Sequence, residues 1–572
     1  MYDNITIHTT VEYDAIVIGS GISGGYAAKE LTQKGLQTLV LERGRPVETL
    51  PTDGMAPWEL PFRGGVPAEV AAAEHVVQRR TYAFNSQTQH FFINDRENPY
   101  IEEKPFTWIR GNHVGGRSIM WGRQCYRWSK MDFEANARDG TAIPWPISYE
   151  EIEPWYTYAE QYAGISGQAE GLDQVPDGAF LPPMEMYCSE RMLKAGVEAA
   201  WPGERIVTIG RVANLTQGLN GRVQCQHRNQ CYRGCSYKAY YSSLNASLPD
   251  AMATGNLTLR PHSNVHSIIY DETLDRAVGV RVVDYVTKEM IEFRAKLIFL
   301  CASTLGSTQI LLNSKTPRFS DGLANSSGVL GHYLMDHHYQ IGAFGLFEGH
   351  EDTYYYGRRP NGIYIPRFQN LPGERQEQDY IRGYGFQGGG SRAGWTRGTS
   401  MSGFGAELKN ALRTPGPWSV SVIAFGETLP YYDNRVSLDP EQTDDWGIPL
   451  LRINCEWKAN EFAMRRDMER ASVEMLEAAG AYNIELYNNY TEGAHGAEPG
   501  LGIHEMGTAR MGDDPRESVL NKHNQAHDVP NLFITDGSCM TSSACQNPSI
   551  TYMALTARAV DYAIRQVNNG AI

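Results

Sequence analysis

The chain has 572 residues, of which 41% are hydrophobic and 20% are charged. This is a globular composition, and the length allows a large core and about three to five domain-sized units. The 51 Lys and Arg residues against 66 Asp and Glu residues give a formal charge of −15 without any sustained basic run, which excludes nucleic acid as an expected partner.

Three features of the sequence bear on the compartment. The N-terminal residues MYDNITIHTTVEYD contain neither the basic nor the apolar region of a secretory signal. No run of about 18 apolar residues is present, so we do not expect an integral membrane protein. The nine cysteines are odd in number and scattered, which is not typical of a secreted disulfide framework. By its own sequence the protein is therefore expected to be cytoplasmic.

The first motif, YDAIVIGSGISGG, lies at residues 13–25. The apolar run Ala15 to Ile18 predicts a buried parallel strand, and the G-x-G-x-x-G at 19–24 predicts a tight turn into a helix whose free N–H groups favour a pyrophosphate. A second apolar run, Thr38 to Leu41, ends at Glu42, where a carboxylate can accept hydrogen bonds from an adenosine ribose. We predict a dinucleotide site here, although the motif does not choose between FAD and NAD.

Two loops follow in chain order. HVGGRSIMWG at 113–122 is suited to lie along a flat ring system, or else is a turn between helices. CQHRNQCYRGC at 225–235 holds three cysteines, and its C-x5-C-x3-C spacing matches no single ligand pattern. The spacing is similar to a ferredoxin-type run in which Arg228 replaces one ligand. An iron–sulfur cluster, a disulfide or other structural role, and a zinc site all stay open.

The second half of the chain contains further strand-to-helix patterns and one region of unusual composition. Residues 297–314 predict another strand, turn and helix, and the C-terminal region predicts a strand that passes through Asp536 into a helix starting near Pro548. Residues 340–430 are rich in Gly, Tyr, Arg and Trp with little helical periodicity. Aromatic and polar loops of this kind suit a sugar; the alternative is a surface sheet with Gly-rich turns.

Several of these segments resemble the glucose–methanol–choline flavoprotein oxidoreductases. They are GSGISGG (19–25) followed by Glu42, VGGRSIMWG (114–122), CASTLGSTQILLNS (301–314), HEMGTARMG (504–512) and TDGSCMTSSACQNPSITYMAL (535–555). The resemblance spans both ends and the middle of the chain. It implies FAD as the cofactor, and it implies that residues 429–457 form a strand pair that returns to the FAD-binding domain.

The fold class implied is α/β, α+β overall, with a Rossmann-like FAD-binding domain built from discontinuous segments and a substrate domain with an antiparallel sheet over the flavin ring. The expected FAD-binding segments are 1–130, 200–335 and 495–572, and the expected substrate-binding segments are 131–199 and 336–494. The residues expected at the cofactor are Gly19, Gly21, Ser23, Gly24, Glu42, Arg43, Gly115, Gly116, Ser118, Trp121, Gly122, Val265, Ala302, Asp536, Gly537, Asn547, Pro548 and Ser549.

The resemblance also implies a catalytic pair. Oxidation of an alcohol needs a base for the hydroxyl proton, and a neutral histidine suits that role. Among the 15 histidines, His504 occupies the place of the family's catalytic histidine, and Asn547 occupies the place of its partner. Asn547 is alternatively a plain helix N-cap. Met120 stands where similar pyranose oxidases carry the histidine that binds flavin covalently, so we expect noncovalent FAD.

Within the family, the closest resemblance is to bacterial sugar dehydrogenases of the glucoside 3-dehydrogenase type. It implies oxidation of a secondary hydroxyl, C3 of a glucoside or of glucose, to a keto sugar. It further implies a small signal-bearing subunit that takes the enzyme to the periplasm, a cytochrome or other electron acceptor, and one [3Fe-4S] cluster on Cys225, Cys231 and Cys235. The open alternatives are a pyranose- or C-glycoside-type sugar oxidase that reduces O2, another alcohol dehydrogenase of the family, and a catalytically silent flavoprotein.

Overall fold

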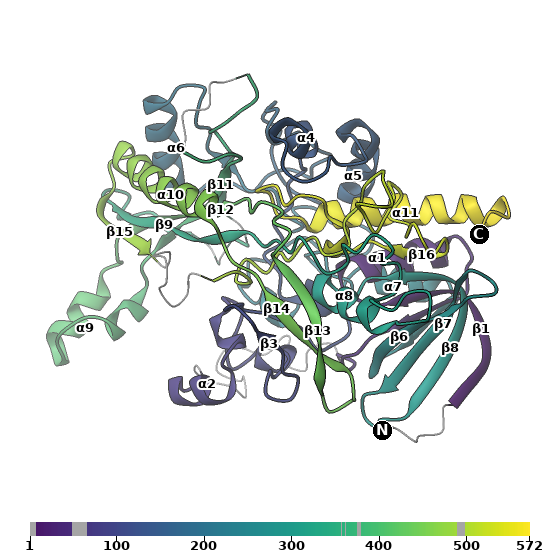
Figure 1. The fold of residues 1–572 in the computed structure, drawn as a ribbon. Helices are drawn as coiled ribbons and strands as arrows, with labels where there is room; N and C mark the ends of the chain where they lie inside the picture. The colour runs from purple at the N-terminus through teal and green to yellow at the C-terminus, as the bar shows by residue number, and fades with distance from the viewer. Residues whose placement is uncertain are drawn as a thin grey trace.

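The computed structural model describes residues 7–47, 66–355, 357, 359–360, 362–373, 379–488 and 498–572. Two sheets lie on opposite sides of the molecule, and helix α11 (Ser549–Asn568) begins between them and runs out over the larger sheet (Figure 1). The expected α/β fold class is confirmed by this arrangement. The junction between the sheets is where the functional site is built.

The larger sheet has the strand order β5-β2-β1-β8-β7-β6, with β16 paired to β8. Its strands are β1 (Ile7–Ile18), β2 (Thr38–Leu41), β5 (Leu257–Arg260), β6 (Ser263–Asp271), β7 (Arg276–Asp284), β8 (Met290–Leu300) and β16 (Leu532–Ile534). Strands β1, β2, β5, β8 and β16 run parallel, whereas β7 is antiparallel to both of its neighbours. The predicted strand Ala15–Ile18 forms the end of β1 and the predicted run Thr38–Leu41 is β2.

Helices cover the larger sheet because its central strands are apolar on both faces. The end of β1 is fully buried from Ala15 to Ile18. Helix α1 (Ile22–Gln33) packs against α7 (Ser247–Ala253) and α11 on one side, and α8 (Thr304–Asn313) packs against β6. The core between α1, α11 and the strands includes Val17, Leu31 and Phe299.

The second sheet has six antiparallel strands in the order β15-β9-β12-β11-β10-β4. They are β4 (Thr208–Ile209), β9 (His338–Phe347), β10 (Ile363–Ile365), β11 (Tyr384–Arg392), β12 (Trp418–Gly426) and β15 (Tyr482–Asn488). Helices α6 (Cys188–Ala200) and α10 (Ala459–Ala478) back this sheet, and Phe386, Val422 and Met468 lie in the core between them. The Gly- and Tyr-rich region 340–430 therefore supplies four strands of a sheet rather than only loops.

The remaining elements connect or flank the two sheets. A three-stranded sheet joins β3 (Ile101–Glu102), β13 (Arg435–Thr443) and β14 (Pro449–Asn454). The other α-helices are α2 (Ala68–Glu74), α3 (Lys130–Phe133), α4 (Ala135–Asp139), α5 (Tyr149–Ala163) and α9 (Gly405–Arg413). Helix α5 packs on α11, where the hydroxyls of Tyr156 and Thr551 lie 2.8 Å apart. Helix α9 projects from the second sheet and buries none of its residues.

The proposed domain segments map onto the two sheets as follows. The strands of the larger sheet fall in 1–130, 200–335 and 495–572, and those of the second sheet fall in 336–494 except for β4, which lies in the 200–335 segment. The boundary expected between 494 and 495 lies outside the described residues. In the described part of the chain, none of the helices combines the length and the apolar character needed to span a bilayer.

Candidate active site

A cavity of about 1170 Å³ extends from the glycine-rich turn after β1 to strand β11 of the second sheet. One end is lined by the backbone of residues 18–23 and by Glu42, and the other by side chains of both sheets and of the N-terminus of α11. A cavity that joins a nucleotide cradle to a mixed aromatic and polar wall can hold a dinucleotide cofactor and an organic substrate together.

The glycine-rich turn can be made only by glycine at two of its positions. Gly19 has φ +93°, and a Cβ there would overlap the carbonyl oxygen of Cys301. A Cβ on Gly24 would overlap the carbonyl oxygen of Gly19, because α1 crosses the end of β1 at close range. By contrast, a Cβ on Gly21 would meet nothing within 4 Å, since this residue faces the cavity. The turn therefore presents bare backbone at the N-terminus of α1, as a pyrophosphate site requires.

Glu42 is held at the end of β2 by the glycine-rich turn. Its Oε2 accepts hydrogen bonds from the backbone N–H and the hydroxyl of Ser20, at 3.0 and 2.6 Å, and its Oε1 accepts one from Gly44 N at 2.8 Å. A carboxylate has about four acceptor positions, so one remains for a ligand in the cavity. The carboxylate thus fixes the turn as well as facing the nucleotide end.

The loop 113–122 lies directly on the glycine-rich turn. Gly115 N donates to the hydroxyl of Ser20 at 2.8 Å, and a Cβ on Gly116 would stand 3.2 Å from Gly21 Cα. The indole of Trp121 is anchored by a 2.9 Å hydrogen bond to the carbonyl of Tyr241. Residues 116–119 form a short 3₁₀ turn. The loop therefore forms one wall of the cavity and is not merely a turn between helices.

Most residues expected at the cofactor line this cavity. Those that do are Gly19, Gly21, Ser23, Glu42, Arg43, Gly116, Ser118, Trp121, Gly122, Val265, Ala302, Asp536, Gly537, Asn547, Pro548 and Ser549. Gly24 and Gly115 do not line it, because Gly24 is packed against Gly19 and Gly115 against the side chain of Leu244. These two glycines shape the wall from behind.

Asp536 joins the first turn of α8 to the short 3₁₀ turn Gly537–Cys539. Its carboxylate accepts hydrogen bonds from the hydroxyl of Ser307 in α8 and from Ser538 N at 3.0 Å. Burial raises the pKa of this carboxyl, and the hydroxyl and N–H donors favour its ionised form. Asp536 thereby ties the α8 turn to the segment that leads into α11.

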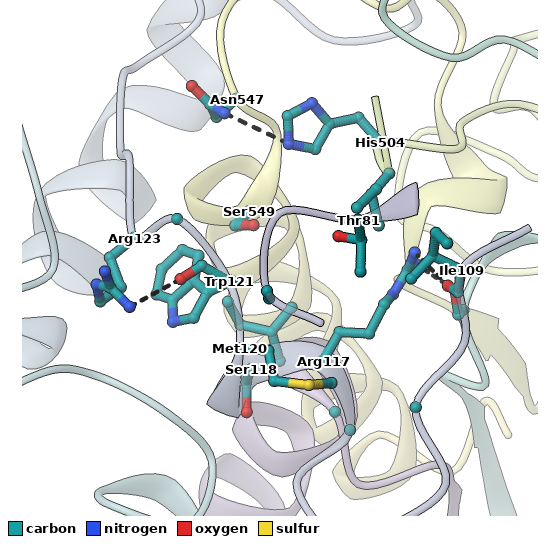
Figure 2. Close-up of a pocket in the computed structure, with 18 of the residues that line it drawn as sticks. Thr81, Ile109, Arg117, Ser118, Met120, Trp121, Arg123, His504, Asn547 and Ser549 are labelled. Atoms are coloured by element: carbon teal, nitrogen blue, oxygen red, sulfur yellow. Dashed lines mark hydrogen bonds between the residues drawn. The ribbon is translucent and has the colours of Figure 1, made fainter. Parts of the chain in front are cut away.

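The opposite end of the cavity carries the expected catalytic pair. His504 and Asn547 point toward one another there, with Asn547 Nδ2 3.3 Å from His504 Nε2, while Trp121, Met120 and Arg117 lie further along the wall (Figure 2). Asn547 stands two residues before the first residue of α11, and the N-cap position of that helix is occupied by Pro548. The plain N-cap alternative for Asn547 is therefore not what the structure has.

His504 is neutral at pH 7. Removal from water lowers the pKa of its imidazole well below the usual value, and the nearby His337 and Arg117 act in the same direction. The backbone of the residue is fixed by Asp336, whose Oδ1 accepts from His504 N at 2.8 Å and whose Oδ2 accepts from Gly500 N at 2.8 Å. A neutral, immobilised imidazole at a cavity wall can accept a proton.

Several residues of this site were not expected from the sequence. His337 Nδ1 lies 2.9 Å from His504 Nδ1, and Gln387 of β11 donates to Asn547 Oδ1 at 2.6 Å. Arg117 makes two hydrogen bonds to the carboxylate of Glu505, at 3.0 and 2.8 Å, and lines the cavity. Of these residues, only Arg117 lies in a segment that the sequence analysis identifies, the loop 113–122. His337 and Gln387 reach the site through the packing of distant strands.

The cysteine loop forms part of the substrate-side wall. His227, Arg228, Asn229 and Tyr232 line the cavity, whereas Cys225, Cys231 and Cys235 do not. In the part of the chain that the structure describes, no disulfide joins the cysteines, so the disulfide alternative is not realised. Burial raises the pKa of the Cys225 thiol, and the other two thiols act in the same direction. No group of three His, Cys, Asp or Glu side chains within the described ranges is arranged to hold a metal.

Comparison with known proteins places this geometry in a family. Family models described as GMC oxidoreductase match residues 13–339 and 430–556. The chain is 29% identical to 2-methyl-1,2-propanediol dehydrogenase of Mycolicibacterium austroafricanum, over 97% of this chain and 96% of that protein. It is 24% identical to the fructose dehydrogenase large subunit of Gluconobacter japonicus, over 98% of this chain and 99% of that protein.

Solved structures share the fold at low identity. Pyridoxine 4-oxidase from Mesorbium loti superposes with a TM-score of 0.60 and 18% identity, covering 96% of this chain and 99% of its own. Formate oxidase of Aspergillus oryzae gives a TM-score of 0.59 and 14% identity, covering 99% of both chains. These likenesses concern the fold alone.

Proposed function

The chain belongs to the GMC oxidoreductase family, and from this premise we propose that it oxidises a secondary hydroxyl of a sugar with FAD as cofactor. The observation that carries the proposal is the neutral His504, which faces Asn547 in the same cavity that exposes bare backbone at the N-terminus of α1. A base for a hydroxyl proton and a cradle for a dinucleotide are the two parts that such an oxidation needs.

The residues present fit FAD. Gly19, Gly21 and Glu42 would hold the adenosine and pyrophosphate part, and Trp121 and the N-terminus of α11 would face the ring system. When bound, FAD would accept the hydride from the substrate carbon. We propose noncovalent binding, because Met120, which lines the wall at this point, offers no nucleophile for a flavin bond.

The proton chemistry belongs to His504 and Asn547. The Nε2 atom of His504 contacts Asn547 Nδ2, so a substrate hydroxyl that reaches both atoms from the cavity would give its proton to Nε2 while the Asn547 amide orients its oxygen. The low pKa of His504 keeps the ring neutral and ready to accept a proton at pH 7. Arg117, paired with Glu505, contributes positive charge to the wall without being a base.

The wall around this pair supports a polyhydroxy substrate. Gln387 and Ser421 of the second sheet offer an amide and a hydroxyl, and Tyr339 and Phe425 offer ring faces. Tyr339 and Phe425 stack at 5.1 Å between centroids, and Phe425 lies 6.2 Å from the ring of His504. Aromatic faces beside polar groups are typical of sugar sites. We propose C3 of a glucoside or of glucose as the oxidised position, following the resemblance in sequence.

The electron acceptor distinguishes two versions of this function. As a dehydrogenase, the protein would pass electrons to a cytochrome or another acceptor and would work with a small signal-bearing subunit in the periplasm. As a sugar oxidase it would reduce O2. The similarity to a chain named as the large subunit of fructose dehydrogenase favours the dehydrogenase.

The iron–sulfur cluster that the resemblance implies on Cys225, Cys231 and Cys235 would supply an electron exit beside the cavity. The described thiols do not form a ligand set, so the residues do not fit a cluster and no electron-transfer step is assigned to them. Iron content of the purified protein, with Cys231→Ser as the comparison in visible absorbance, decides this point.

The experiment that tests the function is an anaerobic screen of flavin bleaching. Glucose, glucosides, disaccharides, fructose, gluconate, short diols and long-chain alcohols are each mixed with the FAD-loaded protein. We expect glucosides to bleach the flavin, with a keto sugar as product. Bleaching by diols or long-chain alcohols alone would contradict the substrate class, and O2 consumption with the active substrate would assign the oxidase.

A further inference from the structure

His337 lies directly behind His504 and outside the cavity. It is the last residue before β9, it is fully buried, and it does not line the cavity wall. Its ring is 4.9 Å from the ring of His504 between centroids and nearly perpendicular to it, at 81°. The contact is made through nitrogen atoms: His337 Nδ1 and His504 Nδ1 are 2.9 Å apart.

The proton positions in this contact follow from the backbone carbonyl at the other ring nitrogen of His337. His337 Nε2 lies 3.0 Å from the carbonyl oxygen of Ser543, which can only accept a hydrogen bond, so this Nε2 carries the proton. Burial lowers the pKa of His337 to about 4, so the ring is neutral and its Nδ1 has a free lone pair. The proton between the two rings must therefore sit on His504 Nδ1.

The same tautomer is required from the cavity side. With a proton on Nδ1, the neutral His504 has its lone pair on Nε2, where Asn547 Nδ2 stands at 3.3 Å as a donor. The Asn547 amide is oriented in turn, because its Oδ1 accepts from Gln387 Nε2 at 2.6 Å. Every contact from Ser543 to Gln387 is thus a donor facing an acceptor, and the array has one consistent direction.

We propose that His337 is a positioning residue that fixes the tautomer of His504, so that the Nε2 lone pair faces the alcohol in the cavity. This inference rests on the proposed function, because it assumes that His504 takes the hydroxyl proton. It adds the requirement of a defined His504 tautomer, which the pairing of His504 with Asn547 does not by itself include. An isolated imidazole has two neutral tautomers, and only the one with a bare Nε2 can serve as base here.

In the proposed reaction, His337 acts only as a hydrogen-bond acceptor. The substrate O–H bond would break and its proton would bond to His504 Nε2, while the C–H hydrogen and its electron pair would leave as a hydride, which FAD would accept when bound, and a carbonyl would remain. His504 then carries protons on both nitrogens. Its Nδ1–H continues to donate to His337 Nδ1, which stabilises the imidazolium as the orienting group of a catalytic triad does. His337 itself does not change protonation.

The adjacent His338 provides a matched control. It is equally buried, and burial lowers its pKa in the same way, but its Nε2 contacts the carbonyl of Glu427 at 3.2 Å and it makes no contact with His504 that the structure describes. Replacement of either histidine removes a buried ring from the same segment. Only replacement of His337 removes the acceptor of the His504 proton.

The test compares His337→Leu, His337→Asn and His338→Leu as FAD-loaded proteins with a substrate found by the bleaching screen. We expect His337→Leu to lower the rate of flavin reduction at saturating substrate by at least about 100-fold, since a wrong tautomer removes the base. We expect little change in the substrate concentration for half-saturation. His337→Asn should recover at least about tenfold of this loss, because its Oδ1 can accept the same proton.

A second readout follows the tautomer itself, without turnover. In protein labelled with 15N-histidine, the ring signals lost in His504→Asn identify His504, and we expect an unprotonated Nε2 in the wild type and in His337→Asn. A protonated Nε2 in the wild type would overturn the inference, even if His337→Leu fails to fold. Equal rates for His337→Leu and His338→Leu, or equal losses in His337→Leu and His337→Asn, would overturn it as well.

Failure of the proposed function would give a different result from failure of the inference about His337. If His504→Asn reduces its flavin as fast as the wild type, the base assignment is wrong and the proposed function falls. If His504→Asn is inactive while His337→Leu is fully active, only the inference about His337 falls.

Discussion

The two ends of the cavity are built in different ways. At the nucleotide end, the shape is set by backbone: Gly19 and Gly24 are required by contacts with Cys301 and with each other. At the catalytic end, the shape is set by side chains that come from β11, from the residue before β9, and from the segments carrying His504 and Asn547. The first end is a local motif, and the second exists only after the two sheets have come together.

This difference predicts how each end fails. A substitution in the backbone cradle meets immovable main-chain atoms, so it affects folding and cofactor binding together. A substitution in the side-chain array leaves the cradle intact, so it affects chemistry while the cofactor stays bound.

Gly24→Ala is expected to have the largest effect. Its Cβ would overlap the carbonyl of Gly19, so α1 cannot keep its distance from β1, and we expect insoluble protein or protein without FAD. FAD content after purification is the measurement. Gly21→Ala is the matched variant, because its Cβ would meet no protein atom within 4 Å. It should fold normally and lose FAD affinity only through contact with the cofactor; equal solubility and FAD content in both variants would contradict this account.

His504→Asn is expected to come next. Loss of the base should lower the rate of flavin reduction by about 10²- to 10⁴-fold, while the FAD content and melting temperature stay close to those of the wild type. Anaerobic stopped-flow absorbance measures the rate. Loss of bound FAD in this variant would show that the two ends are not separable as described.

The same difference explains how far the sequence alone could lead. The strand, turn and helix around residues 15–33, and the C-terminal helix starting after Pro548, are predictable because an apolar run, a glycine-rich turn and a helix-start proline are local signals. Glu42 followed from its place after the second strand. His504 and Asn547 were named by resemblance, not by pattern.

The rest of the site depends on contacts between distant segments. His337 and His504 are separated by 167 positions in the chain, and Gln387 and Asn547 by 160. No local period encodes such a pair, because the partners meet only when the second sheet contacts the segments that carry His504 and Asn547. The Gly-rich run in β11 leaves a loop and a sheet both open in the sequence for a related reason: its side chains are too small to show alternation.

Gln387→Leu is expected to have a smaller effect. It removes the donor that orients the Asn547 amide, and we expect the rate of flavin reduction to fall roughly fivefold, as for the loss of one neutral hydrogen bond. Gln369→Leu is the matched control, because Gln369 donates to Tyr384 at 2.8 Å in the same sheet and does not line the cavity. A loss as large in the control as in Gln387→Leu would mean that the sheet, not the amide, is responsible.

The smallest expected effect is that of pH. A base must be unprotonated, and the pKa of His504 lies well below the usual histidine value, chiefly because of burial, with the nearby His337 ring and Arg117 acting in the same direction. The rate of flavin reduction should therefore change less than about twofold between pH 6.5 and 8.5, and should fall only at pH values below the ordinary histidine range of about 6.5. Stopped-flow reduction across this range is the measurement.

The carboxyl group of Asp336 is the one neighbouring group considered that can change the slope of the rate of flavin reduction against pH between pH 6.5 and 8.5. Burial and the charge of Glu505 raise the pKa of Asp336 to about 7, although its three backbone N–H donors favour the ionised form. Asp336 contacts the backbone of His504 and not the cavity, so its titration can act only by moving the base. If a break near pH 7 is present in the wild type and absent in Asp336→Asn, it belongs to this carboxyl. If it persists in Asp336→Asn, His504 titrates near its ordinary value, and the catalytic end is less shielded from water than its geometry implies.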